Sequence, residues 1–189
     1  MPIEIEIKLK VDGPAPIRET LKSLGAEPLG EVLETNIFLD TIDRALLSAD
    51  CALRLRRNRS LADGHEMLVI TYKGPREEGV VKRREEIEVI VEDMDHVMAL
   101  LDRLGFQETV CFEKRRETWQ FGQCMIELDE MPKLGAFVEI EGPTESAVTN
   151  AQAKLGLTDL QPLPESYADL VTRHLSDIGE HGTRLTFSP

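Results

Sequence analysis

The segment IEIEIKLK, residues 3–10, places an aliphatic residue at every second position and a charged residue between each pair. This two-residue period is that of a β-strand, which turns its aliphatic side chains to one face and Glu4, Glu6 and Lys8 to the other. Such a strand fits an antiparallel sheet that is wetted on one face. It also fits a sheet whose charged face lines a binding site, and the other strands must decide between the two.

Five later segments, at 52–57, 67–74, 82–91, 124–130 and 135–142, also read as strands, and most alternate in the same way. Each sets apolar residues against positions that are mainly Glu, Asp, Arg or Lys, whereas ordinary surface faces also carry Ser, Thr, Asn and Gln. The charged positions in phase are Arg54, Arg56, Lys73, Arg84, Glu86, Glu88, Glu127, Asp129, Glu139 and Glu141. A further strand at 107–119 has Lys114 and Arg116 in phase, although its other face is polar too.

The order of expected elements favours an α+β fold with an antiparallel sheet. Strands occur in runs and do not alternate one for one with helices, which disfavours a parallel doubly wound sheet. We expect one domain over residues 1–178 and a C-terminal tail, 179–189, that has no period and is disordered. Helices are expected at 15–24, from Asp93 to Gly105, at 144–155 and at 165–177, and one more strand at 31–41.

Composition narrows the classes of function. A formal net charge of −13 disfavours binding to nucleic acid. No apolar run approaches the roughly 20 residues that cross a bilayer, and no segment reads as a signal peptide, so we expect a cytoplasmic protein without membrane contact. Cys51, Cys111 and Cys124 are widely spaced and odd in number, which argues against a disulfide framework or a zinc site.

Charged faces that converge inside a curved sheet would hold acids and bases at high density, which costs free energy unless they pair or bind an ion. Carboxylates suit a hard cation such as Mg²⁺ or Mn²⁺, and Arg and Lys suit phosphate oxygens. Together they predict a site for a metal and a polyphosphate. Alternation alone does not say which face lies inside, so a solvated charged face remains the alternative.

The chain resembles the CYTH, or triphosphate tunnel metalloenzyme, superfamily. Glu4, Glu6 and Lys8 form its E-x-E-x-K signature near the N-terminus. Further similar segments follow in the expected order: TNIFLDT (35–41), ALRLR (52–56), TYKGPR (71–76), REEIEV (84–89), LDEMPKLGAFVEIEG (128–142) and SYADLV (166–171). The ordered set is specific, and within the superfamily it is most similar to the class IV adenylyl cyclases.

The resemblance implies a closed eight-stranded antiparallel β-barrel, a tunnel with a charged interior and helices packed outside. It implies metal ligands at Glu4, Glu6, Glu139 and Glu141, with Glu86, Glu88, Glu127 and Asp129 as supporting acids. It implies triphosphate binding by Lys8, Arg54, Arg56, Lys73, Arg84, Lys114 and Arg116, of which Lys8, Arg54 and Arg56 are the expected catalytic residues.

The function implied is that of an enzyme that uses Mg²⁺ or Mn²⁺ on a small-molecule triphosphate: ATP, inorganic triphosphate or thiamine triphosphate. Two reactions fit, namely adenylyl cyclase, which forms cyclic AMP and pyrophosphate, and triphosphate phosphohydrolase. A non-catalytic module that binds polyphosphate or nucleotide is the alternative. The same resemblance leaves a homodimer open.

Overall fold

A computed structural model describes residues 3–76, 82–179 and 183–187, with the backbone alone described for residues 3, 4, 82 and 83. The strands are β1 (Ile3–Val11), β2 (Glu27–Thr41), β3 (Ala52–Ser60), β4 (Glu66–Lys73), β5 (Lys82–Val91), β6 (Phe106–Phe121), β7 (Cys124–Met131), β8 (Gly135–Glu141) and β9 (Arg184–Leu185). The helices are α1 (Ala15–Ser23), α2 (Ala45–Ser48), α3 (Met94–Arg103), α4 (Glu145–Lys154) and α5 (Tyr167–Asp177).

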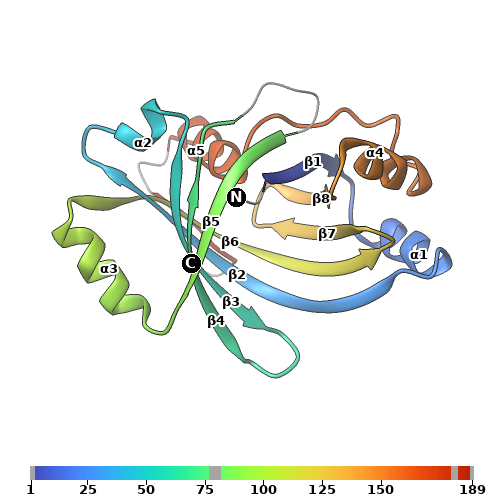
Figure 1. The fold of residues 1–189 in the computed structure, drawn as a ribbon, viewed down its shortest axis with the longest axis horizontal. Helices are drawn as coiled ribbons and strands as arrows, with labels where there is room; N and C mark the ends of the chain where they lie inside the picture. The colour runs from blue at the N-terminus through green and yellow to red at the C-terminus, as the bar shows by residue number, and fades with distance from the viewer. Residues whose placement is uncertain (1–2, 77–81, 180–182, 188–189) are drawn as a thin grey trace.

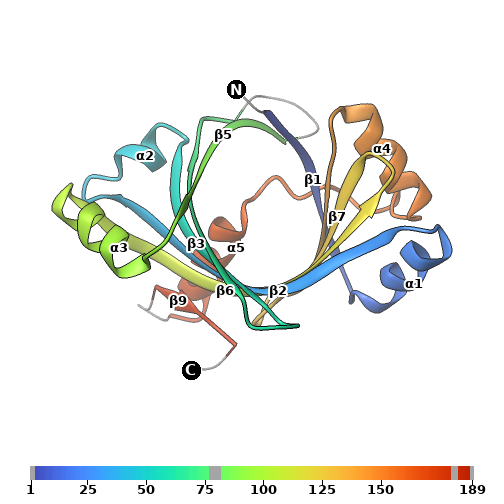
Figure 2. The ribbon, with the colours of Figure 1, turned by 60° about the horizontal axis from the view of Figure 1, so that its bottom comes forward.

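The strands form one sheet in the order β2-β3-β4-β5-β1-β8-β7-β6-β9, and β2 also pairs with β6 (Figure 1). All pairings among β1 to β8 are antiparallel, and β9 is parallel to β6. In Figure 2 the strands curve around a common centre, with α1 and α4 on one side and α2 and α3 on the other. The predicted α+β fold with an antiparallel sheet is confirmed.

Three helices cover the aliphatic face that the alternation predicts. Helices α1 and α4 pack on β1, β7 and β8, where Leu9, Leu21 and Val138 are fully buried. Helix α3 packs Leu101 against Leu55 and its neighbours on β2, β3 and β6. Burial of these aliphatic side chains leaves the charged side chains of the same strands on the opposite, inner face.

Helix α5 differs, because it packs against the inner face at one end of the sheet. Tyr167 and Val171 belong to a buried cluster with Phe112 and Phe137, and Phe112 is two residues from Lys114, on the same face of β6. The expectation that the helices all pack outside is therefore wrong for α5. The physical reason is that the inner face is not charged along its whole length. At one end it carries apolar residues, and α5 buries them.

Two short elements were not predicted. Helix α2 follows a turn in which the Asp40 carboxylate accepts backbone hydrogen bonds from Leu46 and Leu47, both at 3.0 Å. Strand β9 pairs with β6 and buries Leu185, so the expected disorder of the tail is wrong for these residues. Elements of four and two residues are too short to show a period. Within the described residues, no helix is both long and apolar enough to cross a bilayer.

Candidate functional site

A cavity of about 530 Å³ lies among the strands, and we call it the central cavity. Residues from β1 to β8 line it, together with Tyr167 of α5, and all are charged except Phe38, Phe112 and Tyr167. The predicted site residues that line it are Glu6, Lys8, Arg54, Arg56, Lys73, Glu86, Glu88, Lys114, Arg116, Glu127, Glu139 and Glu141. The charged strand faces therefore converge on one space.

The strand register explains how residues far apart in sequence meet there. Lys8 on β1 lies opposite Glu139 on β8, which in turn lies opposite Glu127 on β7. Glu6 lies opposite Glu141 in the β1–β8 pair. Because directly opposed residues of an antiparallel pair point to the same face, one wall of the cavity carries four neighbouring carboxylates and one ammonium.

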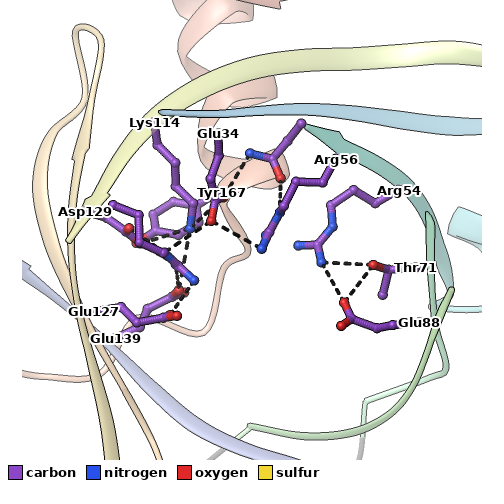
Figure 3. Close-up of polar contacts among 12 residues, drawn as sticks. Glu34, Arg54, Arg56, Thr71, Glu88, Lys114, Glu127, Asp129, Glu139 and Tyr167 are labelled. Atoms are coloured by element: carbon purple, nitrogen blue, oxygen red, sulfur yellow. Dashed lines mark hydrogen bonds and ion pairs between the residues drawn. The ribbon is translucent and has the colours of Figure 1, made fainter. Parts of the chain in front are cut away.

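Asp129 organises the basic side chains on the β6 wall (Figure 3). It is fully buried and accepts hydrogen bonds from Lys114 Nζ at 3.0 Å and Arg116 Nε at 2.7 Å. The Tyr167 hydroxyl donates a further bond to Asp129 at 2.6 Å. Asp129 does not line the cavity, and its hydrogen bonds hold these three side chains in place.

Glu34 on β2 belongs to the same network, and the sequence analysis missed it. Its carboxylate lies 3.3 Å from Arg56 Nη1 and 3.4 Å from Lys114 Nζ. Burial alone would raise the pKa of Glu34, but Arg56, Lys114 and Arg116 lower it well below its usual range. The two-residue period of this strand could have predicted the position of Glu34. Glu34, Asn36 and Phe38 lie on one face of the strand, and the apolar Leu33 and Ile37 lie on the other.

The sequence analysis named Tyr167 only within the similar segment 166–171 and gave it no role. In the structure, its ring lies close to the ammonium groups of Lys8 and Lys114. Its ring lies 3.8 Å from Lys8 Nζ and 4.6 Å from Lys114 Nζ, distances at which a cation is attracted to the ring face. Lys8 Nζ also lies 3.3 Å from Glu139. Burial, followed by the charges of Asp129 and Glu139, raises the pKa of Tyr167 well above its usual value, so the hydroxyl keeps its proton.

The β3 wall carries two guanidinium groups whose environments differ. Arg56 Nε donates to the Asn36 side chain at 2.8 Å, whereas Arg54 Nη2 donates to Thr71 Oγ1 at 3.1 Å. Thr71 in turn donates to Glu88 at 2.9 Å, as Figure 3 shows. The Arg54 Nε is buried without a hydrogen-bond partner among the described residues. Burial and the charge of Arg56 lower the pKa of Arg54 to about 10, so it is charged at neutral pH.

Besides Asp129, two of the predicted residues are not placed in the central cavity. Arg84 instead donates to the backbone carbonyls of Gly74, at 2.9 Å, and Asp50, at 3.1 Å, and it lines a second cavity. The Glu4 side chain lies outside the described residues. Lys73, which forms an ion pair with Glu86, lines both cavities.

Among the acids of this network, Glu127 is the one whose negative charge is stabilised least by its surroundings. Burial raises its pKa, the nearby Glu139 and Asp129 raise it further, and the contact with Arg116 only partly offsets them, which leaves the pKa at about 8. The Arg116 guanidinium is shared with Asp129 and Glu139, and these acids together raise the pKa of Arg116. Asp129 and Glu139 also contact Lys114 and Lys8, so Glu127 shares its Arg116 contact with two acids that have further cationic partners.

We expect Glu127→Gln to stabilise the unliganded protein above pH 8 by on the order of 2 kcal/mol. The folded-state pKa is raised from 4.5 to about 8, so the folded protein holds a proton that the unfolded chain releases, and stability falls as pH rises through this window. Glutamine carries no such cost. Denaturant unfolding at pH 4.5 and pH 8.5 should show a gain at the higher pH only. Glu130→Gln, exposed on the opposite face of β7, is the control, and equal gains for both variants would contradict the assignment.

The wall that carries Glu6, Glu127, Glu139 and Glu141, which we call the acidic wall, has the chemistry of a divalent-cation site. Mg²⁺ is held in many enzymes by one or two carboxylates together with substrate phosphate oxygens. The opposed Glu6 and Glu141 meet that requirement in chemistry and position. No group of three or more acidic, His or Cys side chains in the described part of the chain is gathered as a metal cage. The wall therefore fits a metal whose coordination a phosphate completes.

Known proteins share this sequence and fold. The family model described as the CYTH domain matches residues 2–174. A Methanocaldococcus jannaschii protein named "Putative adenylate cyclase" is 36% identical over 139 residues, which are 74% of this chain and 76% of that protein. A solved Pyrococcus horikoshii structure has a TM-score of 0.79 at 32% identity and covers 90% of this chain and 99% of its own.

A more distant neighbour shares the fold. It is the "Putative adenylyl cyclase HpAC1" from Hippeastrum, described as having a dominant triphosphatase activity, with a TM-score of 0.69 at 20% identity, covering 94% of this chain and 96% of its own. The family match covers most of the residues that form the sheet and the central cavity. The chain therefore belongs to the CYTH domain family.

Proposed function

We propose that the chain is a divalent-metal-dependent enzyme that acts on a triphosphate bound in the central cavity. The observation that carries this proposal is the buried Arg54 guanidinium, whose Nε has no hydrogen-bond partner among the described residues. An unpaired buried donor costs roughly 1–3 kcal/mol, and more when it is charged. A phosphate oxygen at Arg54 would remove that cost with a charge-assisted hydrogen bond.

We further propose that β1 to β8 act as the closed barrel of a tunnel. The pairing of β2 with both β3 and β6 supports this, since those strands stand near opposite ends of the sheet order. Closure would keep water away from the charged face, where electrostatic interactions are stronger than at an open surface. It would also fix the distance between the β3 wall and the acidic wall.

The two walls suggest separate roles in the reaction. Arg54 and Arg56 would bind the phosphate oxygens and stabilise charge that develops on them, with Lys8 reaching them from β1. Glu6 and Glu141, with Glu139, would hold Mg²⁺ or Mn²⁺, which supplies charge neutralisation at the reacting phosphorus. Asp129 and Glu34 keep Lys114 and Arg116 oriented by the hydrogen bonds and ion pairs already described.

Two reactions fit this arrangement. Attack of water on the terminal phosphorus breaks a phosphoanhydride bond and releases orthophosphate. Attack of the ribose 3′-hydroxyl of ATP on the α-phosphorus forms cyclic AMP and releases pyrophosphate. The lining of the central cavity holds charged groups for phosphate and metal, which both reactions require.

Product analysis tests the proposal. The pure protein is incubated with Mg²⁺ or Mn²⁺ and with ATP, inorganic triphosphate or thiamine triphosphate. Metal-dependent release of orthophosphate supports the hydrolase, and cyclic AMP with pyrophosphate supports the cyclase. Tight binding of the triphosphates without turnover would support a non-catalytic module, and absence of both binding and turnover would refute the proposal.

Arg54→Ala is expected to weaken triphosphate binding by roughly 1.5–3 kcal/mol, about 10- to 100-fold, because it removes charge-assisted hydrogen bonds. Arg59→Ala on the same strand is the matched control, since Arg59 is exposed and odd-numbered positions of β3 face away from Arg54. Titration calorimetry measures both. The assignment fails if the two substitutions weaken binding equally.

A further inference from the structure

Two lysines of the central cavity share one uncharged neighbour. Lys8 and Lys114 are the most deeply buried cations of the lining, at 2% and 1% exposed. They come from β1 and β6, which β8 and β7 separate in the sheet. The ring centroid of Tyr167 on α5 lies 3.8 Å from the Lys8 ammonium and 4.6 Å from the Lys114 ammonium, and Figure 3 shows the ring beside Lys114. One helix residue therefore contacts cations from two separate strands.

The Tyr167 ring is fixed in one orientation. Its hydroxyl donates to the buried Asp129 at 2.6 Å, and its ring meets the Phe137 ring edge-on, with centroids 5.3 Å apart. Tyr167 is the first residue of α5, and Ser166 and Asp169 form a capping box at that end of the helix. The ring is therefore a rigid surface for both ammonium groups.

The chain that leads into α5 holds Lys8 as well. Within the described residues, β5 pairs with β1 only as far as Glu6. Beyond that pairing, the Leu163 N–H donates to the Lys8 carbonyl at 2.8 Å. Lys8 Nζ in turn donates to the backbone carbonyl of Glu165 at 3.2 Å. The position of the Lys8 ammonium therefore depends on the segment 163–167 and not on the sheet alone.

An aromatic ring at this place has an advantage over another acid. A ring face attracts a cation through its quadrupole and adds no charge. The two ammonium groups already lie 3.3 Å from Glu139 and 3.0 Å from Asp129. A further carboxylate beside them would repel a phosphate that approaches the same ammonium groups. The Tyr167 ring holds both cations without that repulsion.

We propose that Tyr167 is a positioning residue, whose ring holds the Lys8 and Lys114 ammonium groups where they bind the phosphate oxygens of the triphosphate. The inference rests on the proposed function, because it takes a phosphate as the ligand of both lysines. It adds to the site a residue that acts through other side chains, since small displacements of binding groups reduce binding and turnover. It also divides the side chain into two parts: the ring acts on the lysines, and the hydroxyl acts on Asp129.

Three variants separate the ring from the hydroxyl and from helix packing. Tyr167→Phe keeps the ring and removes the hydroxyl, whereas Tyr167→Leu removes the ring. Val171→Ala is the control for packing, because Val171 is fully buried in the same cluster and lines neither cavity. Titration calorimetry uses Mg²⁺ and the diimido analogue of inorganic triphosphate, in which NH groups replace the bridging oxygens and prevent turnover. Tyr167→Leu should weaken binding tenfold or more, and the other two variants should weaken it less than threefold.

A second measurement needs no ligand. In spectra of the unliganded protein with ¹³C-labelled lysine, the ring current of Tyr167 should shift the ε-CH₂ signals of Lys8 and Lys114. Both shifts should remain in Tyr167→Phe and disappear in Tyr167→Leu. Lys154, whose ammonium lies 5.6 Å from the Phe121 ring, is the internal control and should not change. Spectra of Lys8→Arg and Lys114→Arg assign the two signals.

The remaining outcomes separate the inference from the proposed function. If the analogue does not bind the wild-type protein, the proposed function fails and the inference fails with it. If the wild-type protein and Tyr167→Leu bind the analogue equally, the triphosphate site stands and the inference is overturned. Equal losses in Tyr167→Leu and Val171→Ala would show a packing role only, and equal losses in Tyr167→Leu and Tyr167→Phe would assign the effect to the hydroxyl. Either result overturns the role of the ring, as does a Tyr167→Leu spectrum in which both lysine shifts remain.

Discussion

Asp129→Asn is expected to lower the free energy of unfolding by about 3 kcal/mol or more. The substitution keeps the shape of the side chain and removes the charge that holds Lys114 and Arg116, which are 1% and 8% exposed. Glu34 and Glu139 remain near these cations, but Lys114, Arg116 and Tyr167 lose the charged acceptor that they share. In a chain of this size, a loss of that kind lowers the melting temperature by roughly 6–12 °C.

Differential scanning calorimetry of the unliganded protein measures this effect. Asp159→Asn is the matched control, because Asp159 is an exposed loop residue and surface substitutions usually change stability by less than about 0.5 kcal/mol. A melting temperature for Asp129→Asn within 1–2 °C, roughly, of the control would show that the network does not depend on its central acid.

Glu6→Gln is expected to reduce turnover by a factor of ~100 or more, because it would remove a carboxylate from the proposed metal site. Glu6 lies on the acidic wall opposite Glu141, and glutamine keeps its size while losing its negative charge. The metal concentration that gives half-maximal rate should rise, and the melting temperature of the unliganded protein should not fall.

Glu66→Gln provides the comparison, since Glu66 is an exposed residue at the start of β4 and lines neither cavity. Rates are measured over a range of Mg²⁺ concentrations with the triphosphate that the wild-type protein turns over. Normal turnover by Glu6→Gln at low Mg²⁺ would remove Glu6 from the metal site. A loss of turnover accompanied by a lower melting temperature would indicate a structural role.

The period-two pattern predicted much of the sheet and most of the residues in the central cavity. The pattern succeeded because the two faces differ so strongly in charge, as with Ile7 against Lys8 and Ile140 against Glu139. It predicted the phase of β6 as well: Lys114 and Arg116 both point inward and are buried, although the outward positions of that strand are also polar. One of these, Glu117, accepts hydrogen bonds from Arg18 of α1.

The period-two pattern could not predict other features of the fold and of the candidate site. Arg84 is in phase with Glu86 and Glu88, but its long side chain reaches backbone carbonyls away from the central cavity, and periodicity does not report such a reach. The position of α5 depends on Phe112 and Phe137, which look like ordinary apolar strand residues until the sheet is curved. Glu34 was within reach of the same alternation and was overlooked because its nearest neighbours in phase, Asn36 and Phe38, are uncharged.

The position of β1 in the sheet also affects the order in which the protein can assemble. β1 is the first strand of the chain, but it pairs with residues 82–85 on one side and with residues 136–141 on the other. During synthesis, Glu6 and Lys8 emerge early and gain their β8 neighbours only after about 140 residues have been made. Contacts between such distant segments form slowly. Both walls of the central cavity therefore come together late in folding, and a chain that stops before β8 lacks the acidic wall.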